Sequence, residues 1–330
     1  MIRSLFLAVL GLCSIGVAAC ARSTTISPDP TADPGARLRI LAANEPEPRS
    51  LAVDRTHLYW TVHREGFGAE VRRMLRSGGA VTTLARGVTG PSAIAVRGPE
   101  VWVASLGGAS AIENTDPNVH VLKGALGVAT TAGEVFFGDA TAGEVRRAFP
   151  TKSSLTRTSR LPFMLATDER HVYWTELAGG ITRVERTGTP TPLVITDHRV
   201  GRIALDAGNV VWVDVDTGTI SRRPKIGGPV TVIAEGQHGA AGLAVDGGRV
   251  VWTHPASGTI RSASVAGGPW TVIAEEQLDP AEIVADDGSI YWITHEGTIV
   301  GLEKRDWYGG TPEALARRAT RPLDRAGHPR

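Results

Sequence analysis

The sequence predicts an all-β protein: a single β-propeller of about seven four-stranded blades. Three observations predict this fold. One unit of about 40 residues repeats along most of the 330-residue chain. An aromatic residue recurs at one position of that unit, and Asp-Gly and Gly-Gly pairs, which favour tight hairpins, recur between its short apolar runs. Four antiparallel strands per unit are typical of propeller blades, which bury both faces only when they stack in a ring.

Two neighbouring copies show the unit most clearly. Residues 243–253 read LAVDGGRVVWT, and residues 203–213 read IALDAGNVVWV at the same positions. The continuous apolar run predicts a first strand buried on both faces, and the β-branched and aromatic run predicts a second strand. A Gly-Thr-Ile segment and a closing Thr-Val-Ile-Ala, present in both copies, predict strands three and four.

The aromatic residues lie 42, 35, 37, 38, 40 and 40 residues apart. We interpret this anchor position as packing between blades rather than as a carbohydrate-stacking platform, because it recurs in every copy. The anchors are Trp60, Trp102, Phe137, Trp174, Trp212, Trp252 and Trp292. An Asp lies six residues before five of them, where we expect a turn-capping residue rather than an array of carboxylates: Asp54, Asp168, Asp206, Asp246 and Asp286.

The N-terminus has the pattern of a secretory signal. A basic start at Arg3 precedes a short apolar run that ends Val17-Ala18-Ala19-Cys20, which resembles the bacterial lipobox. The alternative is an ordinary signal peptide cut at the small residues. The resemblance implies that residues 1–19 are removed and that Cys20 is lipidated, so that its acyl chains make the membrane a partner. Ala21 in the next position implies sorting to the outer membrane.

Composition divides the remainder of the chain. Residues 20–36 are rich in Ser, Thr, Pro and Asp, which predicts a disordered linker, and residues 317–330 predict a flexible tail. The propeller is expected over residues 37–316. The 35 basic and 34 acidic residues of the whole chain nearly cancel, which argues against nucleic acid as a partner.

The repeat also resembles a known family. Tyr59-Trp60-Thr61, Tyr173-Trp174-Thr175-Glu176 and Val211-Trp212-Val213-Asp214 are similar to the YWTD repeat of low-density-lipoprotein-receptor propellers. The resemblance covers residues 50–310, and it implies a propeller. YWTD propellers usually have six blades, whereas this sequence has seven anchors.

Two segments compete to complete the last blade. Leu38-Arg39-Ile40-Leu41-Ala42 reads as a fourth strand whose first three are missing, and it can join the blade of Trp292. Residues 309–316 have the same character. Only one of them can lie beside the third strand, and the N-terminal segment is favoured.

Candidate binding residues are expected where the turns between second and third strands meet the blade-to-blade connections, because loops carry function on a rigid scaffold. We call this face the rim. The acids and histidines expected there are His63, Glu65, Glu113, Asp139, Glu176, Asp214, His254, His295 and Glu296, and the connections add Asp197, His198, Arg199, His238 and Asp279. Residues 104–116 form the longest expected rim loop.

Known catalytic motifs are absent from the sequence, including H-E-x-x-H, G-x-S-x-G and G-x-x-x-x-G-K-[ST]. No catalytic residue and no cofactor are therefore predicted, although a divalent metal at the propeller axis is possible. The leading hypothesis is an envelope-tethered, non-enzymatic scaffold that binds protein or glycan through the rim. At the level of architecture it resembles the propeller lipoprotein that assists outer-membrane barrel assembly. The alternative is a metal-assisted hydrolase or lyase with an axial site.

Overall fold

The computed structural model describes residues 38–64, 68–107, 112–158, 161–177, 179–186, 189–194 and 196–303. The chain divides into two units, residues 1–36 and 37–330, and every described strand belongs to the second. The predicted signal peptide, Cys20, the linker, the 309–316 segment and the 317–330 tail lie outside the described residues.

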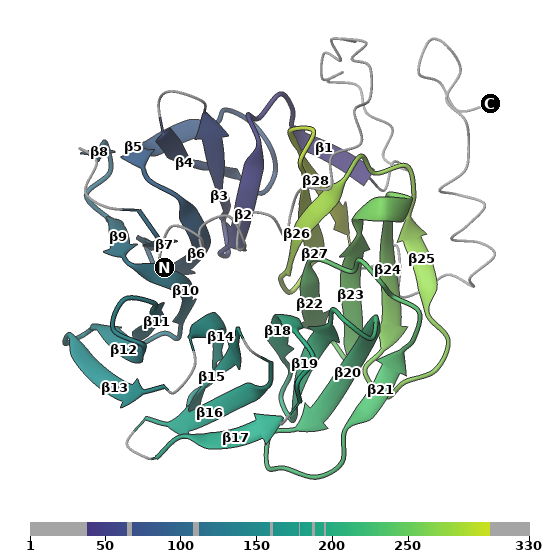
Figure 1. Ribbon diagram of the computed structural model, residues 1–330. Helices are drawn as coiled ribbons and strands as arrows, with labels where there is room; N and C mark the ends of the chain where they lie inside the picture. The colour runs from purple at the N-terminus through teal and green to yellow at the C-terminus, as the bar shows by residue number, and fades with distance from the viewer. Residues whose placement is uncertain are drawn as a thin grey trace, which may run out of the picture. The chain divides into compact units, whose positions relative to one another are not determined.

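Seven sheets form a ring, and the first strand of each lies nearest the centre (Figure 1). The predicted seven-bladed, all-β propeller is confirmed. Blade 1 contains β2 (Pro48–Val53), β3 (His57–Arg64), β4 (Gly68–Leu75) and β5 (Thr82–Val88); blade 2 contains β6 (Pro91–Arg97), β7 (Glu100–Ser105) and β9 (Val119–Lys123); blade 3 contains β10 (Ala125–Thr130), β11 (Val135–Asp139), β12 (Glu144–Phe149) and β13 (Ser153–Arg157).

The remaining blades follow the same order, with one 3-10 turn at Pro255–Ser257. Blade 4 contains β14 (Pro162–Thr167), β15 (His171–Glu176), β16 (Ile181–Glu185) and β17 (Thr191–Val194); blade 5 contains β18 (Val200–Leu205), β19 (Asn209–Asp214), β20 (Thr219–Pro224) and β21 (Thr231–Ala234); blade 6 contains β22 (Leu243–Asp246), β23 (Arg249–His254), β24 (Thr259–Ser264) and β25 (Thr271–Ala274); blade 7 contains β26 (Pro280–Ala285), β27 (Ser289–Thr294), β28 (Thr298–Glu303) and β1 (Leu38–Ala42).

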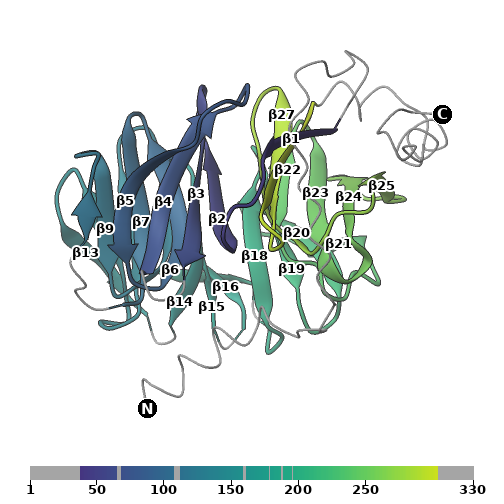
Figure 2. The ribbon, with the colours of Figure 1, turned by 90° about the horizontal axis from the view of Figure 1, so that it is seen from above.

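The N-terminal segment closes the ring. β1 pairs antiparallel with β28, with Leu38 opposite Leu302 and Ile40 opposite Val300, so it is the outer strand of blade 7. Figure 2 shows β1, from the start of the propeller, crossing beside the last blade. The favoured alternative for closure is therefore confirmed.

Blade 2 departs from the predicted four strands. It has three, and its outer strand β9 runs parallel to β7. A parallel neighbour requires the chain to return to the starting end of β7 before β9 begins. Between β7 and β9, the chain forms β8 (Glu113–Asn114), which pairs with β5 on the outer edge of blade 1. Glu113, expected in the rim loop over residues 104–116, therefore lies on an outer sheet edge rather than on the rim.

The anchor position of blade 2 also differs from the prediction. In blade 2, Ile94 pairs with Val103 as Leu51 pairs with Trp60 in blade 1, and Trp102 pairs with Ala95 as Tyr59 pairs with Ala52. Trp102 therefore lies one residue before the anchor position, and because side chains alternate along a strand it points to the opposite face. Trp102 packs against blade 3, and Val103, fully buried, takes the anchor position.

The other anchors pack against the preceding blade. Trp252 lies among Val211, Ile220 and Ile233 of blade 5, and Trp60, Trp174, Trp212 and Trp292 are similarly placed and almost fully buried. Phe137 keeps the anchor register but is only half-buried. Packing between blades therefore accounts for the recurring aromatic residue.

The recurring Asp residues cap the turn between first and second strands. Asp54 Oδ1 accepts the backbone N–H groups of Thr56 and His57 at 2.7 Å each. Asp168, Asp206 and Asp286 accept the equivalent pair of N–H groups. Asp246 occupies the same position in blade 6. Each of these carboxylates lies at the turn of its own blade, in five of the seven blades, and Asp168 and Asp286 also form ion pairs with an adjacent blade.

Candidate functional site

Two rim carboxylates accept hydrogen bonds mainly from backbone N–H groups. Asp139 Oδ1 accepts the N–H groups of Thr141 and Ala142, and Asp214 Oδ1 accepts that of Thr217. Both side chains are largely buried in the turn after the second strand. Glu176, at the same position in blade 4, accepts the Thr182 hydroxyl at 2.8 Å. Local turn geometry, rather than a ligand, accounts for these contacts.

Histidine–carboxylate pairs lie on the rim of blades 5 and 7. His295 Nδ1 is 2.8 Å from Asp279 Oδ2, and His198 Nδ1 is 3.3 Å from Asp214 Oδ2. Each pair joins a blade connection to a turn after a second strand. Beside His198, Arg199 contacts Asp216 through both its backbone N–H and its guanidinium. The rim of blades 5 and 7 therefore has several charged side chains close together, and each contacts a partner of opposite charge or a histidine.

His254 is the most buried of the predicted rim histidines. Its Nδ1 is 2.9 Å from the Ser257 hydroxyl, which also accepts a hydrogen bond from Arg261. Burial, together with the charge of Arg261, holds the pKa of His254 below its usual value. His254 is therefore neutral near neutral pH. His63 and Glu296 are exposed, and Glu65 lies outside the described residues.

A repeated contact on the connections was not predicted. Glu45, Gln237 and Gln277 each lie fifteen residues before an anchor tryptophan and accept its indole N–H at 2.8, 3.1 and 2.9 Å. The backbone N–H of each residue donates to the glycine that ends a turn of the preceding blade. The constant spacing of fifteen residues between this Glu or Gln and the tryptophan could have predicted the contact from the sequence. In blade 5 the same position is Asp197, whose side chain is 99% exposed.

The connection before blade 7 presents an apolar side chain. Leu278 is 68% exposed, between Glu276 and Asp279, which have positive φ values of 59° and 50°. Non-glycine residues adopt this left-handed backbone at an energetic cost. In blade 6 the equivalent positions are Gly236 and Gly239. The connection before blade 1 has the same backbone, with φ values of 58° at Asn44 and 38° at Glu47, so this conformation recurs between blades. In blade 7 it places Leu278 next to the His295–Asp279 pair.

The rim residues do not assemble into a metal site. Within the described ranges, no group of three or more His, Cys, Asp and Glu side chains lies close enough to hold a metal ion. The axial metal considered from the sequence therefore lacks a fitting donor set in this part of the chain, and no step through a metal is derived.

A cavity follows the propeller axis. It has a volume of about 370 Å³ and is lined by first-strand residues of all seven blades. One position, ten residues before the anchor position, contributes six of the lining residues: Ser50, Ala93, Gly127, Met164, Arg202 and Glu282. Irregular pairing of the first and second strands occurs beside this position in six blades. Such bulges redirect side chains.

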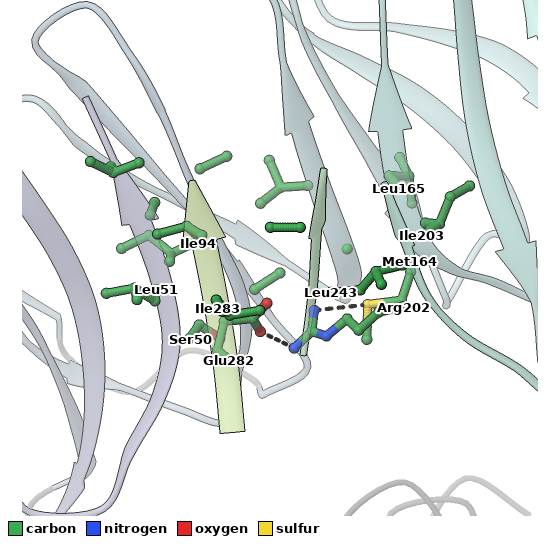
Figure 3. Close-up of a pocket in the computed structure, with 18 of the residues that line it drawn as sticks. Ser50, Leu51, Ile94, Met164, Leu165, Arg202, Ile203, Leu243, Glu282 and Ile283 are labelled. Atoms are coloured by element: carbon green, nitrogen blue, oxygen red, sulfur yellow. Dashed lines mark hydrogen bonds and ion pairs between the residues drawn. The ribbon is translucent and has the colours of Figure 1, made fainter. Parts of the chain in front are cut away.

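Arg202 and Glu282 meet across the axial cavity (Figure 3). Arg202, from β18, forms an ion pair with Glu282, from β26, and its Nη1 lies 3.2 Å from the Met164 sulfur. Burial raises the pKa of the Glu282 carboxyl, and this effect outweighs the lowering by Arg202. The sequence analysis did not identify either residue, because each is a single polar residue in an otherwise apolar strand, at a position that differs from one copy of the repeat to the next.

The structure explains how the pair spans the intervening blade. Blade 6 has Gly242 at the same position, and a Cβ there would lie 2.3 Å from the Ala281 carbonyl oxygen. The close approach of β22 and β26 therefore requires glycine. The missing side chain leaves the path between Arg202 and Glu282 clear.

Comparisons with known proteins concern the fold. No family model and no curated protein matches the sequence. A streptogramin B lyase is similar in structure, with a TM-score of 0.64 and 15% identity over 81% of this chain and 97% of that chain. Virginiamycin B lyase from Staphylococcus aureus gives 0.62 and 15% over 81% and 98%. BamB from Moraxella catarrhalis gives 0.53 and 13% over 78% and 85%. At these identities the likeness shows the β-propeller fold alone.

Proposed function

We propose that this propeller is a non-enzymatic binding module, tethered to the cell envelope through Cys20, that recruits a protein partner through the rim of blades 5–7. The observation that carries the proposal is the connection before blade 7. It places Leu278 in solvent, 68% exposed, where the equivalent residues of the connections before blades 1 and 6 are Pro46 and His238. An exposed aliphatic side chain within a polar surround is the usual composition of a protein–protein contact.

The surroundings of Leu278 favour a protein over a glycan. The His295–Asp279 pair lies beside it, and the His198–Asp214 and Arg199–Asp216 pairs lie on the rim of blade 5. Charged groups at the edge of a contact set its orientation and its rate of formation. Glycan sites rely on exposed aromatic rings, whereas the anchor tryptophans are buried between blades.

The tether rests on the N-terminal sequence. Val17-Ala18-Ala19-Cys20 resembles a lipobox, and Ala21 fits sorting to the outer membrane. Among the described residues, no helix is long and apolar enough to cross a bilayer. The fold similarity to BamB and the YWTD-like repeats are compatible with an envelope binding module.

The experiment compares two exposed aliphatic residues. Leu278→Asp places a charge at the centre of the proposed contact, and Ile226→Asp places one on the turn between β20 and β21, away from the rim, where Ile226 is 92% exposed. Cross-linking and affinity purification from membranes are expected to recover a protein with the wild type and Ile226→Asp, but not with Leu278→Asp. Equal recovery with all three chains contradicts the rim proposal, and recovery of glycan instead of protein contradicts its partner class.

The fold is similar to that of two lyases, and the alternative function is therefore that of an enzyme. The metal-assisted form considered from the sequence is not supported, because the rim histidines pair with separate carboxylates or hydroxyls rather than with one another. The alternative therefore rests on the axial cavity alone.

A further inference from the structure

Most blades have an uncharged residue at the position that faces the propeller axis. Five of the seven blades close with Ser50, Ala93, Gly127, Met164 or Gly242 at the position where blades 5 and 7 carry Arg202 and Glu282. A partly buried ion pair is weak evidence of a stabilising role, because removing both groups from water costs about as much as their attraction returns. The pair therefore calls for an explanation other than blade packing.

Arg202 has unused hydrogen-bonding capacity. A guanidinium offers five N–H donors in a planar fork, and among the described residues its side-chain partners are Glu282 and Met164. The Met164 thioether is a weak acceptor. The Arg202 side chain is 27% exposed, so part of the fork remains accessible from the cavity. A planar carboxylate fits such a fork through two parallel hydrogen bonds.

The cavity around this fork has the size of a small-molecule site, and its wall combines apolar side chains with polar groups. Its volume of about 370 Å³ lies within the usual range for ligand pockets, roughly 300–1,000 Å³. Leu51, Ile94, Leu165, Ile203 and Ile283 contribute apolar surface from different blades. Polar groups of the first strands are also exposed in the wall, and the charged fork of Arg202 is placed to fix the orientation of a bound molecule.

We propose that the axial cavity binds a small organic carboxylate, with its carboxylate on the guanidinium of Arg202 and its apolar body against the first strands. This site goes beyond the rim proposal and does not depend on it. Glu282 occupies one edge of the fork and competes with the ligand. The ligand carboxylate brings a second negative charge close to Glu282, so binding is accompanied by uptake of one proton at the Glu282 carboxyl.

The direction of the Glu282 shift agrees with that proton uptake. Burial already raises its pKa, so less free energy is needed to protonate it when the anion arrives. Arg202 is the one other charged side chain lining the cavity in the described part of the chain. Binding should therefore tighten as the pH falls from 7.5 to 5.5, and this dependence should disappear in Glu282→Gln.

The probes are three molecules with the same apolar body: 4-phenylbutanoate, its amide and 4-phenylbutylammonium. Calorimetry on the intact propeller is expected to show binding of the carboxylate and at least roughly tenfold weaker binding of the amide, the difference expected for a charged hydrogen bond. Arg202→Met should weaken binding of the carboxylate by at least roughly tenfold. Glu282→Gln should retain or tighten it. Arg222→Met, which removes an arginine of β20 outside the cavity lining, should leave it unchanged.

Several results would overturn the proposal: no binding of the carboxylate at about 10 mM, which is weaker than any specific site requires; tighter binding of the ammonium probe; or full binding by a folded Arg202→Met chain. If Arg202→Met does not fold, the proposal is tested by two other measurements. These are the comparison of the carboxylate with the amide, and the pH dependence of binding in wild type and Glu282→Gln. Loss of the rim partner in Leu278→Asp with carboxylate binding intact would show that the two sites are separate.

Discussion

Single side chains join neighbouring blades at both ends of the ring. On the rim, Gln237 accepts the indole N–H of Trp252 and a guanidinium N–H of Arg261. On the opposite face, Lys225 of blade 5 lies 2.9 Å from Asp168 of blade 4, and Arg76 of blade 1 lies 2.7 Å from Asp286 of blade 7. Gln237 also donates its backbone N–H to Gly218 of blade 5, and each of the two ion pairs connects the turn after a third strand to an adjacent blade.

Removing the indole acceptor should be costly. Gln237→Leu leaves the buried N–H of Trp252 without its partner, and we expect a loss of about 1–3 kcal/mol in the free energy of unfolding. Urea denaturation measures it. Asp197→Leu changes the same repeat position before Trp212, where the side chain is exposed, and should alter stability much less. Equal losses in the two variants would refute the role of the acceptor.

Asp168 should make stability depend on pH in the acid range. Burial raises its pKa, but Lys225 and the N–H groups of His171 and Arg170 outweigh burial and hold the pKa at about 2. Tyr173 also donates to this carboxylate, and His171 lies 3.9 Å away. Because the folded pKa is below the unfolded value of about 3.8, the stabilisation is complete above pH 4 and is lost as the pH falls through about 2.

Asp168→Asn tests this dependence. With allowance for solvent screening, we expect it to lose about 1 kcal/mol of stability at pH 5 and progressively less toward pH 2. Denaturation at both ends of that range measures the change. Asp206→Asn is the control, because Asp206 accepts the same turn bonds but forms no ion pair within the described ranges. A pH-independent loss in Asp168→Asn would contradict the assignment.

At the scale of strands, blade 7 depends on a segment distant in sequence. Four residue pairs join β1 to β28, and Ala42 is buried with Trp60 and Ile299 in the cluster between blades 7 and 1. Without β1, blade 7 would have three strands and an open edge.

A chain that begins at residue 43 should therefore be less stable than one that begins at residue 37, by about 2–4 kcal/mol for four cross-strand pairs. Thermal unfolding of the two chains, made without the N-terminal signal, measures the difference. Identical midpoints would mean that β1 does not hold the ring closed.

Strand register explains where the repeat misled the sequence analysis. Trp102 was assigned to the anchor series because it is the aromatic residue of its copy, but its strand register matches that of Tyr59, so it lies on the other face and Val103 takes the anchor position. Glu113 was assigned to the rim from its place after the second strand, yet the chain returns along blade 1 before β9 begins. Both errors concern blade 2, the copy that departs most from the repeat.

At the scale of the whole molecule, the proposed tether is set by Cys20. Cys20→Ala removes the only thiol that the predicted lipidation can use, and we expect the protein to move from the membrane pellet to the soluble fraction. Fractionation with immunodetection measures this. A His63→Ala chain, altered on the exposed end of β3, should stay in the pellet. Retention of Cys20→Ala in the membrane would contradict lipidation.

The sequence by itself determined the blade count, the turn residues and most of the packing anchors, because each depends on contacts within one blade or with its neighbour, and these repeat every 40 residues or so. Only the tertiary structure decided what faces the axis. Arg202 and Glu282 are 80 residues apart and belong to different blades, and they meet because the ring closes around them and Gly242 leaves the way clear. The exposure of Leu278 was likewise decided by backbone conformation in one connection. Periodic sequence specifies the repeated sheet, whereas a site assembled from several blades depends on the positions where the copies differ.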